Sequence, residues 1–102
     1  MTLLEECCKR IVNERMIEWF NARHAKVLST IKKYEKLLAS EIVLITSIEK
    51  ATLLQTLYEL RTRKLISHDG EKYHIPNEAE TLNSLLEMAE RETVKILAKS
   101  KH

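Results

Sequence analysis

The chain has 102 residues, a formal net charge of +2 and 44% hydrophobic residues, with one glycine and one proline. This composition excludes a disordered tail or a loop-rich secreted scaffold and favours long helices around a thin core. No apolar run approaches the ~20 residues of a membrane span, and the acidic N-terminus is unlike a signal peptide. We therefore expect a cytoplasmic protein without a membrane partner.

Residues 2–20 are expected to form an amphipathic helix, because Thr2 is a good N-cap and apolar residues recur every three or four positions. Asn21 to His24 interrupts this stripe, which resumes in a second helix over 25–38. Because neither glycine nor proline lies in the break, one continuous kinked helix is the alternative.

The two cysteines, Cys7 and Cys8, are adjacent and would point about 100° apart on a helix. This geometry suits neither a metal clamp nor a redox pair. We expect both thiols to be reduced, with one as a small core residue. An intermolecular disulfide across a dimer axis is the alternative.

The segment over 40–46 is apolar and rich in β-branched residues, but its length and flanks favour a short helix over a buried strand. A turn at Ser47 and Ile48 precedes a longer helix over 49–64. Its buried face is expected to hold Leu53, Leu57 and Leu60, and its more exposed positions are Lys50, Thr52, Gln55, Thr56 and Glu59. The apolar Leu54 is not fully buried on this register, which suggests contact with another helix or subunit.

Residues 65–76 form the only convincing β element, a hairpin around Asp69 and Gly70, because Asp-Gly is the strongest short hairpin signal. The single proline, Pro76, closes the second strand. Asn77 then caps a final helix with apolar residues spaced by threes and fours.

This order of elements resembles the winged helix-turn-helix of small MarR-, PadR- and ArsR-type regulators. The residues that carry the resemblance are Ser40 to Ile42, Ile48, Thr52-Leu53, Leu57 to Leu60, Leu65-Ile66 and Asp69 to Ile75. The family often has glycine where this chain has Ser47 and Lys64, and a residue other than glycine can adopt the left-handed conformation at modest cost. The expected fold is mainly α with one β-hairpin, as one domain over 1–102: a flanking helix (1–24), a winged-helix core (25–76) and a C-terminal dimerisation helix (77–102).

The resemblance implies binding of double-stranded DNA as a transcriptional regulator, with the recognition helix over 49–64 in the major groove and the wing over 65–76 on the backbone or minor groove. The expected contact residues are Lys50, Thr52, Gln55, Thr56, Arg63, Lys64, His68 and Lys72. Gln55 would pair with adenine, Lys50 would contact guanine or phosphate, and His68 and Lys72 on the wing would approach the minor groove or the backbone. The alternative is a winged helix used as a protein-docking module, since a fold does not dictate a function.

The flanking helices are too long and apolar to stay uncovered, which predicts a homodimer with recognition helices about 34 Å apart. The expected interface residues are Leu3, Cys7, Trp19, Phe20, Leu82, Leu85, Leu86, Ala89 and Ile96. The alternative is that both helices fold back onto one monomer. No phosphate loop, metal-ligand cluster or nucleophile elbow is present, so we expect neither enzyme activity nor a metal or cofactor.

Overall fold

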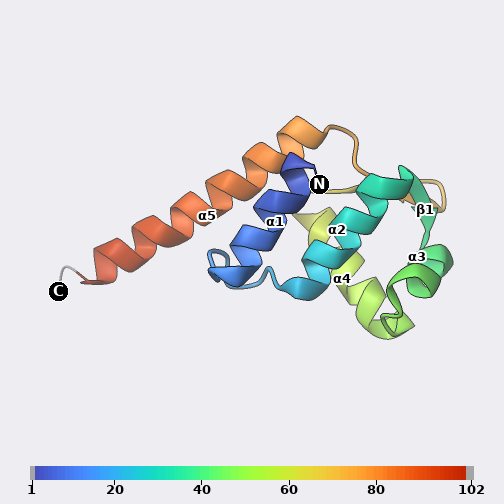
Figure 1. The fold of residues 1–102 in the computed structure, drawn as a ribbon, viewed down its shortest axis with the longest axis horizontal. Coiled ribbons are helices and arrows are strands. Elements are labelled where there is room, and N and C mark those ends of the chain that lie inside the picture. The colour runs from blue at the N-terminus through green and yellow to red at the C-terminus, as the bar shows by residue number, and fades with distance from the viewer. Residues whose placement is uncertain (1, 101–102) are drawn as a thin grey trace.

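The computed structural model describes residues 2–100, with side chains through residue 94 (Figure 1). The elements in this range are α1 (Leu3–Asn13), α2 (Ala22–Tyr34), β1 (Lys36–Leu38), α3 (Ala39–Thr46), α4 (Lys50–Thr62), β2 (Ser67–Asp69), β3 (Lys72–His74) and α5 (Glu78–Ser100). The protein is therefore mainly helical with a small antiparallel sheet, as expected in outline.

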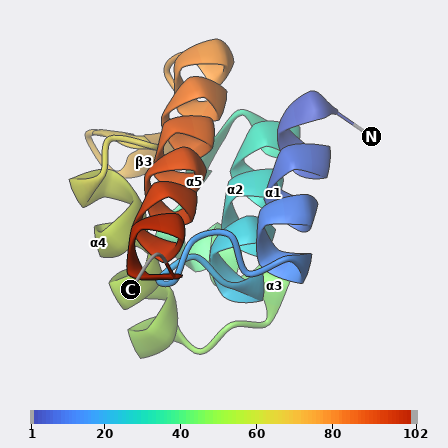
Figure 2. The ribbon, with the colours of Figure 1, turned by 90° about the vertical axis from the view of Figure 1, so that its left-hand side faces the viewer.

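The long α5 determines the shape of the molecule. It begins beside α1, and its C-terminal end extends away from the other elements, on the side opposite to α3 and β1 (Figure 1). Figure 2 looks along this projecting end and separates α1 and α2 from α4. The molecule thus has a helical body with one projecting helix, and its N- and C-terminal helices contact each other.

The sheet contains a strand that the sequence analysis missed. β3 pairs with β2 in the expected hairpin, with Asp69 opposite Lys72 and Gly70 at φ 64° in the turn. β3 also pairs on its other edge with β1, where Leu37 lies opposite Tyr73. The expected helix over 25–38 is therefore wrong beyond Tyr34: Glu35 has φ 68° and the chain continues as a strand.

The first helix is also shorter than expected, because it ends at Asn13 and not near Phe20. Arg15 adopts φ 51°, and the amides of Arg15 and Met16 donate to the carbonyls of Val12 (3.2 Å) and Ile11 (2.9 Å). This is a Schellman ending with arginine at the left-handed position. After an irregular segment, Asn21 caps α2, so the alternative of one continuous helix is wrong.

Ser47 and Lys64, where the resembling family often has glycine, both adopt the left-handed conformation, with φ values of 60° and 61°. The amide of Lys64 donates to the Arg61 carbonyl (2.9 Å) and that of Leu65 to the Leu60 carbonyl (3.0 Å), which ends α4 in a second Schellman motif. These two residues turn the chain on either side of α4.

The core lies where all the helices meet. It joins Leu4, Cys8 and Ile11 of α1 to the apolar faces of α2, α4 and α5; its other members are Ile17, Phe20, Val27, Leu28, Ile31, Leu37, Ile42, Leu53, Leu57, Leu60, Leu65, Ile66, Leu85 and Ala89. The start of α5 is tied to the hairpin by the Thr81 hydroxyl, which donates to the Leu65 carbonyl at 3.1 Å. Asn77 caps this helix, as expected, by accepting from the Glu80 amide.

Lys64→Gly should raise the free energy of unfolding by up to about 1 kcal/mol, because the left-handed conformation costs residues with a Cβ roughly 1–2 kcal/mol and this gain exceeds the added chain entropy. Thermal denaturation should show a Tm higher by a few degrees, given roughly 4–8 °C per kcal/mol for a domain of this size. The matched change Arg61→Gly, inside α4, should lower the Tm. A lower Tm for Lys64→Gly would contradict the left-handed ending.

Candidate nucleic-acid interface

The rotational setting of α4 is determined by its buried face. Leu53, Leu57 and Leu60 are at most 1% exposed, as expected, but Thr56 is also completely buried. The Thr56 hydroxyl donates to the Thr52 carbonyl (2.8 Å) and accepts from Nε of Arg23 (2.7 Å). The expectation that Thr56 faces a groove is therefore wrong, because a side chain of α2 satisfies its hydroxyl inside the protein.

A buried histidine lies next to this contact. His24 is fully buried, and its Nδ1 accepts from the Asn21 amide (3.2 Å). In the neutral ring Nε2 then carries the proton and donates to Oε1 of Glu59 at 3.1 Å. Glu59 also lies 3.8 Å from the Arg23 guanidinium. The Glu59 carboxylate thus faces one guanidinium and one histidine, and it is not the free charge on the outside of α4 that the sequence predicted.

Arg63 is held at the C-terminal end of α4. Its guanidinium lies 3.9 Å from the centre of the Trp19 ring and donates to the Glu59 carbonyl (3.1 Å). Trp19 in turn packs edge-on against Phe20 and His24. Arg63, expected to contact DNA, is half-buried and already engaged in this cation–π contact, which ties α4 to the segment before α2.

The opposite face of α4 is open to solvent. Its exposed residues are Lys50, Ala51, Leu54, Gln55, Tyr58, Arg61 and Thr62, whereas Thr52 is half-buried. Lys50 and Gln55 were expected on this face. Ala51, Tyr58 and Thr62 were missed, although their spacing from Leu54 and Gln55 by threes and fours is visible in the sequence. The exposure of Leu54, at 44%, is confirmed.

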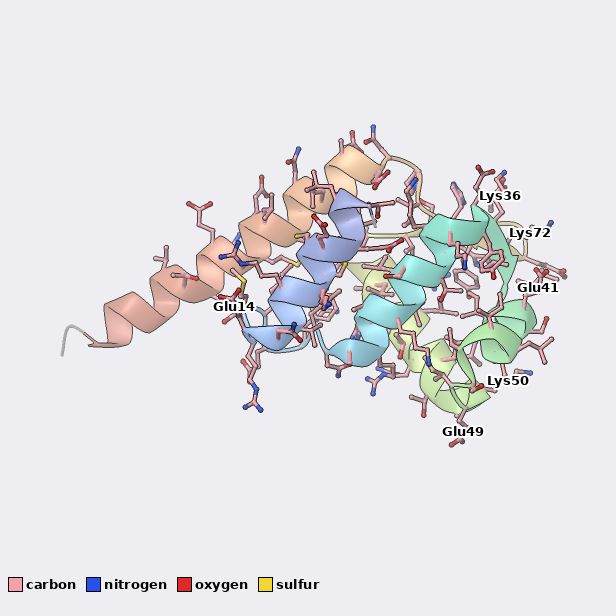
Figure 3. The ribbon with its side chains drawn as sticks, viewed as in Figure 1. Glu14, Lys36, Glu41, Glu49, Lys50 and Lys72 are labelled. Carbon is pink, nitrogen blue, oxygen red and sulfur yellow. The ribbon has the colours of Figure 1, made fainter. Side chains whose placement is uncertain are left out.

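Exposed cations surround this face. Lys64 follows α4, and His68 and Lys72 lie on the hairpin, all exposed as expected. His68 stacks on Tyr73 with ring centres 4.3 Å apart, and its Nδ1 lies 3.4 Å from the Arg61 guanidinium. The hairpin is thereby connected to the end of α4. Figure 3 places Lys50 at the other end of α4, with Lys36 and Lys72 on the sheet.

Acidic residues lie on the same side of the molecule (Figure 3). Glu41 accepts from the Leu38 amide at 2.8 Å, and Asp69 lies 3.8 Å from Lys36. Glu49 precedes α4 and is exposed. This side of the molecule therefore carries charges of both signs. The Glu41 carboxylate is partly satisfied by an amide donor, and the Asp69 carboxylate is partly neutralised by Lys36.

A second open surface lies between α1 and α5. It is a shallow groove of about 420 Å³ lined by Leu3, Glu6, Cys7, Arg10, Ile11, Met16, Leu82, Leu86 and Ala89. Leu3 and Leu86 are 66% and 50% exposed. Phe20, Leu85 and Ala89, expected at a dimer interface, are instead buried in the protomer core, and Trp19 is covered by Arg63. The side chain of Ile96 lies outside the described residues.

The cysteines lie on α1, beside this groove. Cys8 is buried in the core, as expected for one of the pair, and burial raises its pKa to about 12. Burial also raises the pKa of the half-buried Cys7 thiol. Both thiols therefore stay protonated at neutral pH, which makes them poor nucleophiles.

No family model, curated protein sequence or solved structure matches this chain. No helix in the described part of the chain is both long and apolar enough to cross a bilayer. Within those same residues, no three His, Cys, Asp or Glu side chains gather as metal ligands would.

Acidification should destabilise the protein through His24. Burial lowers the pKa of His24, with Arg23 and Arg63 acting in the same sense and Glu59 opposing them. The unfolded chain therefore takes up this proton first, so the stability contributed by neutral His24 is present above its ordinary pKa of 6.5 and is lost as pH falls below it. Denaturant unfolding should give a lower free energy at pH 5.5 than at pH 7.5.

His24→Gln, which cannot take up a proton in this range, should reduce that difference between the two pH values. Gln55→Ala is the control, because Gln55 is exposed and has no titratable group, and it should leave the difference unchanged. An equal pH dependence in the native protein and in His24→Gln would contradict the role of the buried ring.

Proposed function

We propose that this chain is a winged helix-turn-helix protein that binds double-stranded DNA with α4 in the major groove. The order α2, β1, α3, α4, β2, β3 and the strand order β1-β3-β2 support this proposal. So do the left-handed residues Ser47 and Lys64, at the two places where the resembling family often has glycine. β1 supplies the third strand that the hairpin alone lacks.

The observation that carries the proposal is the exposed face of α4. A major groove about 12 Å wide admits one helix, provided that its outer side chains are free. Lys50 and Gln55 are exposed there, while Thr56, Glu59 and Arg63 are turned inward and hold the helix in place. A helix anchored on one side and open on the other is suited to docking as a rigid element.

The electrostatics also favour phosphate more than the sequence suggested. Glu59, which would repel DNA if it were free, lies 3.1 Å from His24 and 3.8 Å from Arg23. Lys64, which precedes β2, and Lys72, which begins β3 after the turn, both remain exposed. The groove contact that we assign is therefore Gln55, with Lys50, Lys64, His68 and Lys72 at the backbone.

Selection from random duplexes at two salt concentrations tests DNA binding. Log affinity against log salt should fall with a slope of about −0.9 for each phosphate neutralised. Lys72→Ala should make this slope shallower by about one unit. Arg91→Ala is the matched control, because Arg91 is exposed on the distant α5 and should not alter the slope. Absence of any duplex binding at low salt would refute the proposed function.

We further propose a homodimer formed through α5 and the adjacent groove. Leu82, Leu86, Thr93 and Ile96 lie on one stripe of α5 at intervals of four, seven and three, the spacing that pairs two helices. Leu86 is half-exposed, and the end of α5 extends beyond the body (Figure 1), where a second copy could cover it. A twofold axis here would leave both α4 helices free.

Leu86→Lys should convert the dimer to a monomer in light scattering, because the new charge would be desolvated at the helix contact. Asn83→Lys, three positions earlier and also exposed, is off the stripe and should leave the mass unchanged. A dimer that persists in Leu86→Lys would place the contact elsewhere.

The second candidate function is protein docking through α3 and α4. Leu44 and Ile45 are 82% and 42% exposed on α3, which is more apolar surface than phosphate contact needs. Binding to a protein partner through these residues would respond little to salt. The salt series above therefore separates this candidate from DNA binding.

A further inference from the structure

The centre of the exposed face of α4 has an unusual composition for a DNA contact. Leu54 and Tyr58 are 44% and 57% exposed, and Ala51 and Gln55 are also exposed. Spacings of three and four residues connect Ala51 to Leu54 and Gln55, and both of these to Tyr58, so the four side chains form one patch whose Leu54 edge borders the buried Leu57. We call these four residues the central strip.

The central strip contains no charged side chain, whereas cations lie at both ends of the helix. Lys50 is in the first turn, and Arg61 is in the last. In a helix docked in the major groove, exposed side chains of its N-terminal half contact base edges, and cations at its ends contact phosphates. The strip is therefore the part of α4 placed to meet bases, and it offers one amide, one phenol and apolar groups.

This chemistry discriminates among base pairs. Guanine is read by Arg or Lys, and cytosine by Glu or Asp, and neither type occurs in the strip. An Asn or Gln amide pairs with adenine, and the C5-methyl of thymine is the apolar group that a base presents in the major groove. The amide of Gln55 suits the adenine of an A·T pair, and the apolar side chains of Leu54 and Tyr58 suit the thymine methyl group.

We infer that the central strip reads A·T pairs, with Gln55 bonded to adenine and Leu54 and Tyr58 packed on thymine methyl groups. The rise from Leu54 to Tyr58 is about 6 Å along the helix axis, close to two base-pair steps of about 3.4 Å. The preferred site is then a short A·T run under α4. The inference rests on the proposed DNA binding and names what that surface recognises.

Replacing thymine by deoxyuridine tests the inference, because it removes the methyl group and leaves base pairing and charge unchanged. On a duplex obtained by the selection above, full replacement in one half-site should weaken binding about fourfold per methyl contacted, from the transfer energy of one buried carbon. Leu54→Ala should bind the thymine duplex more weakly and should lose the part of the response to the replacement that comes from Leu54, while the part from Tyr58 remains.

The control variant is Leu44→Ala, since Leu44 is an equally apolar and more exposed side chain on α3, outside the strip. It should keep the full response to deoxyuridine. All three proteins should have the same Tm, because the substituted side chains are exposed.

The outcomes separate the two proposals. Equal affinity for thymine and deoxyuridine duplexes, or an undiminished response in Leu54→Ala, would overturn the inference and leave DNA binding intact. Selection of G·C-rich duplexes would also overturn it. Failure to bind any duplex would overturn the proposed function and the inference together, and would favour protein docking through Leu44 and Leu54.

Discussion

The rest of the molecule depends on how α4 is held against α2. Apolar packing of Leu53, Leu57 and Leu60 supplies most of the contact, but leucines alone tolerate small rotations of a helix. Polar contacts with defined geometry remove that freedom: Arg23 bonds to the Thr56 hydroxyl and His24 to Glu59. Because buried polar groups are costly when unpaired, a rotated α4 would lose these contacts. The exposed strip is the consequence of this anchoring.

The same cluster changes the electrostatic interpretation of the surface. From the sequence, Glu59 counts against nucleic acid and Arg63 in its favour. In the structure Glu59 is paired, and Arg63 covers Trp19, so neither is a free charge on the outer face. What is left outside is an uncharged strip between cations, together with Glu49. The net charge of a segment could not predict this surface, because the field outside the protein depends on which charged side chains are exposed and unpaired.

The groove beside α1 and the projecting end of α5 lie away from α3 and β1 (Figure 1). A chain that pairs through α5 and binds through α4 would keep its two surfaces apart. Pairing would bury Leu3 and Leu86, and it would leave the α4 anchoring unchanged because Trp19, Phe20 and His24 are already packed within one protomer. Pairing through α5 and DNA binding through α4 would thus use separate surfaces of the protein.

Local signals in the sequence determined that the helices exist, including the short α3, and they determined the Asp-Gly turn. They also determined the caps at Thr2 and Asn77. Each of these features depends on residues within a few positions of one another. The resemblance named Ser47 and Lys64 as positions where the family often has glycine, but only the structure shows their left-handed backbone. The endings of α1 and α2 were missed because Arg15 and Glu35 adopt positive φ without the glycine that normally marks such a position.

Only the tertiary structure decided the features that join distant segments. β1 is a strand because β3, more than thirty positions along the chain, supplies its hydrogen bonds. Thr56 is buried although it is polar, because Arg23 satisfies its hydroxyl, and the same contacts determine which side of α4 faces outward. A residue's own neighbours in sequence specify a helix, but the partner across the core determines which of its faces remains free.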